Sequence, residues 1–359
     1  RGCWGGAGVI WVGGMTSADT APIRTAILGF GLSGRYFHAP FLAADPNFEV
    51  TAVVTSNPER QDAAKELFPD VRLLDSVEDV WNADDIDLVV IGTPSSEHEA
   101  HVDAALDAGK HVVVDKPFAV SSATGRALIE KAKDKGLMLT VFQNRRWDGD
   151  FLTLQRLLES DELGEINRFE SRFEKWRPQV DQSWKTDSTH AQGGGILFDL
   201  GSHVIDQALQ LFGPVADVYA EVETRREFVQ AEDDVFLALR HESGVLSHLW
   251  MSAVAPGPVP RFRLLGARGG YECWGVDGQE AALRGGASPD DPGFGTTPEA
   301  EWGRIYAGGD GQACPTEDGA YGDYYRRVAQ AVRGEGPAPV DPADSVGVLE
   351  IIERAMAEN

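Results

Sequence analysis

Between residues 21 and 144 the sequence alternates short apolar runs with segments of helical pattern. The apolar runs lack the alternation of a half-exposed strand, so we expect them to be buried on both faces of a sheet. Strands that alternate with helices form parallel sheets with right-handed crossovers, and this pattern predicts a doubly wound α/β domain over residues 21–144. The predicted strands are Ile23–Leu28, Val50–Thr55, Ile86–Ile91, His111–Asp115 and Leu137–Phe142. The clearest predicted helices are Pro58–Leu67, Glu97–Ala108 and Ser122–Lys135.

The pattern changes after residue 144. A helix is predicted over 151–158, a second over 193–212 after a glycine-rich break, and then strand-like runs follow one another without helices between them. Such strands form antiparallel sheets, so residues 145–359 are expected to be an α+β domain with a large, open, mostly antiparallel sheet. We expect residues 285–319 to be irregular and helices to follow over 321–333 and 343–357. The strand-like runs are Asp217–Thr224, Asp234–His241, Gly244–Ser252, Arg261–Gly266 and Gly270–Trp274.

The first residues fit neither pattern. The stretch before Met15 combines many glycines with a single basic residue, Arg1, and has no helical or strand periodicity. A secretory signal would carry a basic start, a longer apolar region and a small-residue cleavage site. We expect residues 1–20 to be an extraneous or disordered segment, with Met15 as the natural start.

The charge balance restricts the partners of this chain. Its 57 acidic and 32 basic residues give a net charge of −25, which repels phosphate backbones and anionic lipid headgroups. No apolar run reaches the roughly 18 residues of a membrane span. Cys3, Cys273 and Cys314 are an odd number without CxxC spacing, which predicts neither a disulfide framework nor a thiolate zinc site. We expect a cytoplasmic protein that binds neither nucleic acid nor membranes.

A glycine-rich loop follows the first predicted strand directly. Glycines at these positions let the backbone turn tightly and approach a pyrophosphate, which the N–H groups and the positive end of a helix dipole would bind. A bare GxGxxG is also compatible with an ordinary glycine turn, but its place between a strand and a helix favours dinucleotide binding. The loop reads Gly29-Phe30-Gly31-Leu32-Ser33-Gly34.

The end of the second strand bears on the choice of cofactor. An acidic residue at this point would hold the ribose hydroxyls of NAD, but the first acid here, Glu59, lies beyond a proline in the next helix. Ser56, Asn57 and Arg60 could instead donate to a 2′-phosphate, so NADP is expected in preference to NAD. The alternative is that Arg60 is a solvated helix residue.

Two further strand ends are expected at the same edge of the sheet, where ligands of open α/β sheets bind. The predicted strand Ile86–Ile91 leads into Thr93 and Pro94, with His98 one turn into the next helix, and the strand His111–Asp115 leads into Lys116. A lysine held by a following proline could be a proton donor or acceptor if desolvation lowers its pKa. A structural ion pair between Lys116 and Asp115 is equally compatible with the local sequence.

In the second half, the Gly193-Gly194-Gly195 triplet precedes a helix that carries Asp199, His203 and Asp206. The spacings of four and seven residues place all three side chains on one helix face. An Asp–His pair could handle a proton, with the carboxylate fixing the imidazole tautomer. The alternatives are a satisfied buried polar cluster and an incomplete metal site, for which only His190 lies nearby. We expect no metal.

These motifs occur in an order that resembles the glucose-fructose oxidoreductase, inositol dehydrogenase and MocA (Gfo/Idh/MocA) family. The resemblance runs from about Ile23 to Met356 and includes the glycine loop, the Asp-Lys-Pro strand end, the Asn144-Arg145-Arg146-Trp147-Asp148 run and the glycine triplet with its Asp–His helix. Within the family the sequence looks most like the NADP-dependent scyllo-inositol dehydrogenase branch. The resemblance implies a nucleotide-binding Rossmann domain and an oxidoreductase that interconverts a secondary alcohol and a ketone on an inositol or sugar.

The resemblance also implies residue roles. Lys116 and His203 would handle the proton, Asp199 would orient the substrate hydroxyl, and Asn144 and Arg145 would line the substrate pocket. The nicotinamide would have Trp184 nearby. The strand-end residues Thr93, Pro94, His98, Asp115 and Lys116 would face the cofactor, and the open sheet would form a homo-oligomer, dimer or tetramer.

Two other functions are compatible with the same motifs. A non-catalytic sensor of the same fold would not need Lys116, Asp199 and His203 together. A glycoside-cleaving enzyme that recycles its bound NAD would use the same frame without net cofactor reduction. Three features depart from the family: Asp115 stands where Glu is usual, Asn57 stands where the branch often has Arg, and relatives tend to continue beyond Asn359.

Overall fold

The computed structural model describes residues 21–180 and 188–357. Its N-terminal part is built on a six-stranded sheet in the order β3-β2-β1-β4-β5-β6, with every neighbouring pair parallel. The predicted doubly wound sheet is therefore confirmed. The order reverses between β1 and β4, and ligands of open α/β sheets bind at such a switch point, beside the carboxyl ends of the strands. The strands are β1 (Ile23–Leu28), β2 (Phe48–Val54), β3 (Arg72–Leu74), β4 (Leu88–Ile91), β5 (His111–Asp115) and β6 (Leu139–Phe142).

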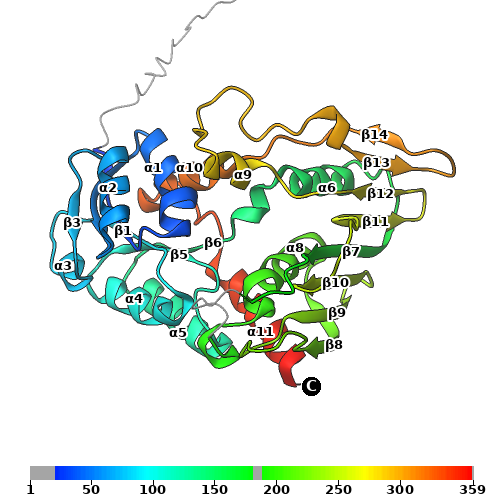
Figure 1. Cartoon of the computed structure of the whole chain (residues 1–359), viewed down its shortest axis with the longest axis horizontal. Helices are drawn as coiled ribbons and strands as arrows, with labels where there is room; N and C mark the ends of the chain where they lie inside the picture. Colours follow the sequence, from blue (N-terminus) through cyan, green and yellow to red (C-terminus); the bar gives the residue numbers. More distant parts are fainter. Residues whose placement is uncertain (1–20, 181–187, 358–359) are drawn as a thin grey trace, which may run out of the picture.

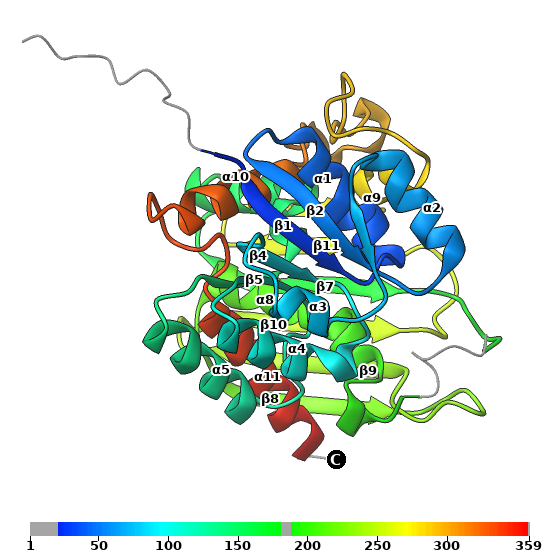
Figure 2. The same cartoon turned by 90° about the vertical axis from the view of Figure 1, so that its left-hand side faces the viewer.

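The edge strand β3 was not predicted from the sequence. It has three residues and is not buried, so it gives no apolar run. The inner strands β4 and β5 are buried because helices cover both sides of the sheet, with α1 and α10 (Tyr321–Val332) above it and α4 and α5 below it in Figures 1 and 2. The helices in this region are α1 (Ala39–Ala44), α2 (Pro58–Leu67), α3 (Glu78–Trp81), α4 (Ser95–Asp107) and α5 (Ser122–Asp134).

The second part contains an eight-stranded sheet in the order β14-β13-β12-β11-β7-β10-β9-β8. Only the pair β7 and β10 is parallel among the strands of this sheet in the described residues, so the expected mostly antiparallel sheet is confirmed. The strands are β7 (Ile166–Glu174), β8 (Val215–Glu223), β9 (Asp234–His241), β10 (Leu246–Ser252), β11 (Phe262–Gly266), β12 (Gly270–Cys273), β13 (Gly303–Tyr306) and β14 (Gln312–Cys314).

Three of these strands correct the sequence prediction. The inner strand β7 was missed because its buried side reads Phe169, Ser171 and Phe173, and the serine interrupts the apolar alternation. Strands β13 and β14 lie within residues 285–319, which were expected to be irregular. They are short and lie among glycines, yet they pair in antiparallel register beside β12.

Helices of the second part pack against the sheet and against the first part. They are α6 (Gly149–Glu159), α8 (Ser202–Phe212), α9 (Gln279–Arg284), α10 (Tyr321–Val332) and α11 (Pro342–Ala357). The last helix, α11, packs between α5 and α8. Its Glu353 accepts hydrogen bonds from the amide and hydroxyl of Ser122 at 2.7 and 2.8 Å. In the sequence, the strands of the first sheet come before Asn144 and those of the second come after it. At the end of the chain, α11 packs against α5 of the first part.

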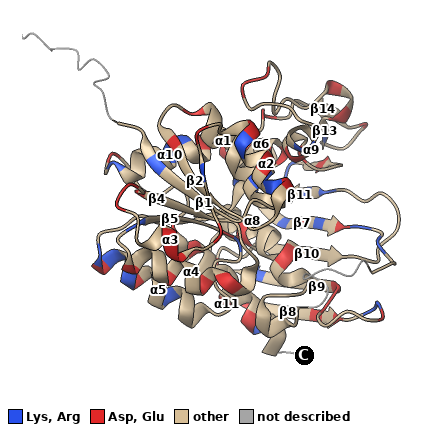
Figure 3. Cartoon of the chain, turned by 60° about the vertical axis from the view of Figure 1, so that its left-hand side comes forward, with Lys and Arg blue, Asp and Glu red and all other residues tan. Residues whose placement is uncertain are grey.

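Acidic residues, drawn red in Figure 3, are spread over the helices and loops of both parts. Within the described ranges, no helix has both the length and the apolar character needed to cross a membrane.

Candidate active site

The glycine loop between β1 and the following helix is closed by close backbone contacts. Gly29 has a φ of +82°, and a Cβ there would lie 2.8 Å from the carbonyl oxygen of Gly92, at the end of β4. A Cβ on Gly34 would overlap the carbonyl oxygen of Gly29. Gly31 is different, because the nearest atom to an added Cβ would be Nη1 of Arg60 at 3.6 Å. The first and last glycines therefore close the loop, while Gly31 presents bare backbone beside a guanidinium.

The other loop residues point in different directions. Phe30 is buried in the core, whereas Leu32 is 46% exposed. Ser33 lies near the end of β5, because an added Cβ on Gly92 would be 3.6 Å from both Ser33 Cβ and Asp115 Oδ2. Leu32, rather than Phe30, thus has a side chain exposed at this loop, whereas the Ser33 hydroxyl is buried beside Asp115.

The end of β2 is exposed at Ser56, Asn57 and Arg60. Asn57 Oδ1 accepts a hydrogen bond from the Arg60 amide at 3.0 Å and caps the first turn of α2. The exposed Arg60 guanidinium lies beside Gly31, and its expected contact with a 2′-phosphate stays a prediction.

The ends of β4 and β5 are joined by His98. Its Nε2 lies 2.8 Å from the carbonyl oxygen of Thr93 and its Nδ1 lies 2.7 Å from that of Pro117. The side chain is 1% exposed. The ring therefore holds the ends of β4 and β5 together. The expected contact of His98 with the cofactor stays a prediction.

Asp115 and Lys116 have separate partners. Asp115 Oδ1 lies 3.0 Å from Nε2 of His38, whose Nδ1 is 2.6 Å from the hydroxyl oxygen of Tyr325. Burial alone would raise the pKa of Asp115, but the charge and hydrogen bond of His38 lower it. Lys116 instead reaches across to the second part, so the alternative of a local Asp115–Lys116 ion pair does not describe this strand end.

Lys116 contacts the turn that begins the long helix of the second part. Its Nζ donates to the carbonyl oxygen of Asp199 at 2.5 Å, and it lies 3.4 Å from the carbonyl oxygen of Phe198 and 3.5 Å from Asp199 Oδ1. Residues Leu197–Gly201 form a π-helical turn before α8. Such turns alter the regular i to i−4 pairing, which can make carbonyl oxygens available to other donors. The contact therefore joins a strand end of the first part to a backbone irregularity of the second.

The π turn also corrects the expectation that Asp199, His203 and Asp206 share one helix face. The Asp199 side chain is 47% exposed beside Lys116, while His203 is buried at 7% exposure in α8. Asp206 is buried and accepts two guanidinium hydrogen bonds from Arg146, at 2.6 and 2.8 Å. The π turn shifts Asp199 relative to the regular helix α8 that carries His203 and Asp206, and Asp206 lies in a buried ion pair with Arg146.

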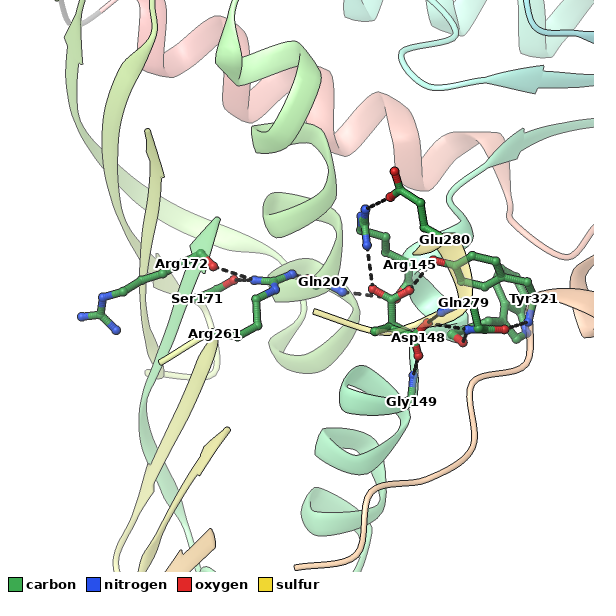
Figure 4. Close-up of polar contacts among 12 residues, drawn as sticks. Arg145, Asp148, Gly149, Ser171, Arg172, Gln207, Arg261, Gln279, Glu280 and Tyr321 are labelled. Carbon is green, nitrogen blue, oxygen red and sulfur yellow. Dashed lines mark hydrogen bonds and ion pairs between the residues drawn. The ribbon is translucent and has the colours of Figure 1, made fainter. Parts of the chain in front are cut away.

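Asn144 and Arg145 are both buried directly after β6. Arg145 donates to Asp148 Oδ2 and to Glu280 Oε2, at 3.1 Å each, and Tyr321 donates to the other oxygen of Asp148 at 2.6 Å (Figure 4). Despite the burial, these acidic neighbours raise the pKa of Arg145 above its usual range. The guanidinium is therefore held in place by carboxylates and stays charged.

A second buried carboxylate lies close to this network. Asp150 Oδ1 has no hydrogen-bond partner within the described residues, and Asp150 lines a cavity of about 60 Å³ together with Asp277 and three threonines. Burial raises the pKa of Asp150, which Arg261 opposes and Asp277 reinforces, and the result is a value of about 6. The folded protein thus retains a proton at Asp150 more readily than an unfolded chain would.

One polar residue near the site was not found in the sequence. Lys175 directly follows β7, and its Nζ lies 5.0 Å from the ring centroid of Phe173. Burial first, and then Arg177, lower the pKa of Lys175, while Asp199 and Glu280 oppose the shift. The sequence could have indicated Lys175 only if β7 had been predicted as a strand, because Lys175 would then follow a strand end.

Two further expectations concern Trp184 and a metal. Trp184 lies outside the described residues, so its expected place near the nicotinamide stays a prediction. Across residues 21–180 and 188–357, no group of three or more His, Cys, Asp or Glu side chains could hold a metal ion.

A glycine loop at the switch point of a doubly wound sheet, with a lysine at a neighbouring strand end that reaches a second part, is typical of a nucleotide-dependent oxidoreductase. Residues 23–143 match the oxidoreductase family with an NAD-binding Rossmann fold, and residues 151–272 match the GFO/IDH/MocA C-terminal domain. The chain belongs to the Gfo/Idh/MocA family and is an NAD(P)-dependent oxidoreductase of the kind that acts on CH–OH groups.

Several known proteins are similar over much of this chain. Scyllo-inositol 2-dehydrogenase (NADP(+)) IolW of Bacillus subtilis (strain 168) is 36% identical over 347 residues, covering 96% of this chain and 95% of that protein. D-apiose dehydrogenase of Paraburkholderia graminis is 29% identical over 236 residues, covering 65% of this chain and 62% of that protein. The solved structure of the oxidoreductase yvaA from Bacillus subtilis has a TM-score of 0.87 at 35% identity, covering 94% of this chain and 97% of that chain.

The raised pKa of Asp150 leads to a stability prediction. The pKa of Asp150 is about 6 in the folded protein, whereas an ordinary carboxyl group has a pKa of about 4. Between these two pH values the unfolded chain gives up the proton more readily than the folded protein, so the free energy of unfolding falls as pH rises. Asp150→Asn should remove this slope and raise the free energy of unfolding at about pH 7.5 by on the order of 1 kcal/mol. Urea unfolding between about pH 5 and pH 7.5 measures it.

The exposed Asp290→Asn variant is the control, because it makes the same charge change on the surface. Parallel pH profiles for Asp150→Asn and Asp290→Asn would contradict the account of this cluster.

Proposed function

We propose that the enzyme is an NADP-preferring dehydrogenase that interconverts a secondary alcohol and a ketone on an inositol or a related sugar. The observation that carries the proposal is the reach of Lys116 from the nucleotide-binding sheet to the turn that bears Asp199. This contact brings a proton-handling side chain to the boundary between a dinucleotide site and a second domain. The similarity to a scyllo-inositol 2-dehydrogenase (NADP(+)) supports the substrate class and the cofactor.

The cofactor fits the glycine loop by shape and charge. Gly31 carries no side chain where a pyrophosphate would approach, and Arg60 lies beside it. Donors surround the end of β2, and the exposed Glu59 lies beyond Pro58. A 2′-phosphate would thus meet the Arg60 guanidinium, which could bind it with paired hydrogen bonds. The residues proposed to hold NADP are Gly29, Phe30 through its backbone, Gly31, Leu32, Ser33, Gly34, Ser56, Asn57, Arg60, Thr93, Pro94, Asp115 and Lys116.

The bound nicotinamide would supply the hydride acceptor, and the protein would manage the proton. Lys116 in its neutral form would accept the proton of the substrate hydroxyl as the C–H hydride leaves, and its ammonium form would return a proton in the reverse direction. The Asp199 carboxylate would orient that hydroxyl, and His203 would pass the proton onward. The carbonyl oxygens of Phe198 and Asp199 would hold the Lys116 ammonium in place after it has accepted the proton.

Asn144 and Arg145 are proposed to line the substrate pocket from the first part. Arg145 is fixed by Asp148 and Glu280, so it would offer a rigid guanidinium to a polyol without a large loss of side-chain entropy.

We further propose a homo-oligomer formed by the sheet face that points away from α8. On β8, β9 and β10 this face carries a partly exposed aromatic strip in which the ring centroids of Phe236 and Trp250 are 5.0 Å apart, and Tyr219 is 55% exposed beside Phe236. Arg172 from β7 covers the Trp250 ring at 3.9 Å. Such a strip fits a second copy of the chain.

Cytoplasmic location stays our proposal, because the odd cysteine count favours a reducing compartment.

Lys116→Met tests the proton role. The variant should lower kcat by about a hundredfold or more, because the apolar side chain cannot accept a proton, while the Kd for NADPH should stay within about threefold of wild type. Steady-state oxidation of scyllo-inositol and nucleotide titration measure the two quantities. Lys133→Met, on the exposed face of α5, is the control. Substantial turnover by Lys116→Met would overturn the assignment.

The same assay separates the other functions compatible with the sequence. Net NADPH formation identifies a dehydrogenase, whereas a glycoside-cleaving enzyme would recycle its nucleotide and a sensor would bind without turnover.

Arg60→Ala tests the cofactor preference. Loss of the guanidinium should lower kcat/KM for NADP about tenfold or more and change kcat/KM for NAD less than about twofold, since only NADP carries the 2′-phosphate. Lys65→Ala, at the other end of α2, controls for charge loss. If wild-type protein has the higher kcat/KM with NAD, the NADP preference is wrong.

A further inference from the structure

The glycine triplet at 193–195 follows from local crowding. Gly193 and Gly195 have φ values of +76° and +95°, a region that favours glycine. A Cβ on Gly194 would overlap the backbone of Ser188, and a Cβ on Gly195 would overlap the carboxylate of Glu232. The chain therefore omits side chains here so that a buried acid can approach the backbone.

Glu232 lies in the connection between β8 and β9, and its side chain is 4% exposed. Its Oε1 accepts a hydrogen bond from the Leu197 amide at 3.2 Å, and its backbone carbonyl accepts one from the Ile196 amide at 2.9 Å. These amides start the helix, where donors lack partners within the helix and a negative charge is favourable. Glu232 thus fixes the start of the helix from the side of the second sheet.

His190 extends the contact to the π turn. Its Nδ1 lies 3.3 Å from Glu232 Oε2, and its ring centroid lies 4.8 Å from that of Phe198. Phe198 is the residue whose carbonyl oxygen lies 3.4 Å from Lys116 Nζ. The acid and the imidazole therefore restrain a backbone group that contacts the lysine.

The glycine segment also touches the strand end that carries Lys116. A Cβ on Gly193 would lie 3.1 Å from Val120 Cγ1, 3.4 Å from Ser95 Cβ and 4.0 Å from Pro117 Cγ. Residues 193–195 thus contact the strand end that carries Lys116 and lead into the π turn whose carbonyl oxygens Lys116 contacts. A displacement of this segment would move the carbonyl acceptors relative to the ammonium.

We propose that Glu232 and His190 are a positioning pair that sets the Phe198 and Asp199 carbonyl groups relative to Lys116. The inference rests on the proposed role of Lys116 in turnover. Neither residue needs to touch substrate or cofactor. The pair affects the rate of proton transfer, because this rate depends on the position of Lys116.

The test compares Glu232→Ala, Glu232→Gln and the control Glu227→Ala, which alters an exposed acid in the same connection. Glu232→Ala should lower kcat by about tenfold to a hundredfold, since a misplacement of about 1 Å has effects of this size, while the KM for NADP stays within about threefold. Glu232→Gln should keep kcat within about threefold of wild type, because its amide oxygen can still accept from the Leu197 amide. Glu227→Ala should match wild type.

Hydrogen exchange gives a readout that does not depend on turnover. Peptides covering residues 196–203 should exchange faster in Glu232→Ala than in Glu227→Ala, while peptides of the six-stranded sheet stay unchanged. Unchanged exchange in 196–203, or wild-type kcat for Glu232→Ala, would overturn the inference. A Glu232→Gln variant as impaired as Glu232→Ala, with loss of NADP binding and a lower Tm, would also overturn it, because the role would then be only structural.

The outcomes also separate this inference from the proposed function. A wild-type protein that oxidises no inositol or sugar with either nucleotide refutes the proposed function, while the exchange measurement still decides whether Glu232 holds the turn.

Discussion

The contact between Lys116 and the π turn at Leu197–Gly201 connects the two parts of this enzyme. The lysine belongs to the end of β5, and its acceptors are carbonyl oxygens of a helix in the second part. Each carbonyl oxygen has two lone pairs, so it can accept from the ammonium in addition to another donor, and the Phe198 oxygen also accepts from the Ser202 hydroxyl at 2.7 Å. The geometry of the site therefore depends on how accurately two separate sheets are held together.

Buried ion pairs after β6 hold the parts together. Arg145 and Arg146 are neighbours in a short 3₁₀ turn, yet Arg145 contacts Asp148 and Glu280 whereas Arg146 contacts Asp206 in α8 and Asp344 in α11. A buried arginine without an acidic partner would cost several kcal/mol, so each guanidinium restricts the elements that supply its carboxylates. One turn thus orients α9 on one side and α8 with α11 on the other.

The fold was largely predictable where physical signals were local. Strands buried on both faces, such as Leu88–Ile91, give apolar runs, and the glycine loop gives a spacing. The strand β7 was not predictable, because Ser171 occupies an inward position that only the packing around Arg261 explains: Arg261 donates to the Ser171 hydroxyl at 2.6 Å. Residues 285–319 contain two strands that the sequence did not predict. Their pairing depends on β12, a segment distant in the sequence, because β13 pairs with β12 and β14 pairs with β13.

The site was predictable in part for the same reason. The sequence identified Lys116 and Asp199, but it could not show that His98 is enclosed by two backbone carbonyls or that Asp206 pairs with Arg146. Helical spacing assumes a regular helix, and the π turn breaks that assumption. Glu232 gave no signal, because its role arises only when the connection between β8 and β9 folds onto the glycine triplet.

The most direct measurement is a crystal structure of the protein with NADP and scyllo-inositol bound. We expect Lys116 Nζ to lie within about 3.2 Å of a substrate oxygen whose carbon faces the nicotinamide C4, with Arg60 on the 2′-phosphate. A substrate bound with its reacting oxygen more than about 5 Å from Lys116, or a nucleotide bound away from the glycine loop, would contradict it.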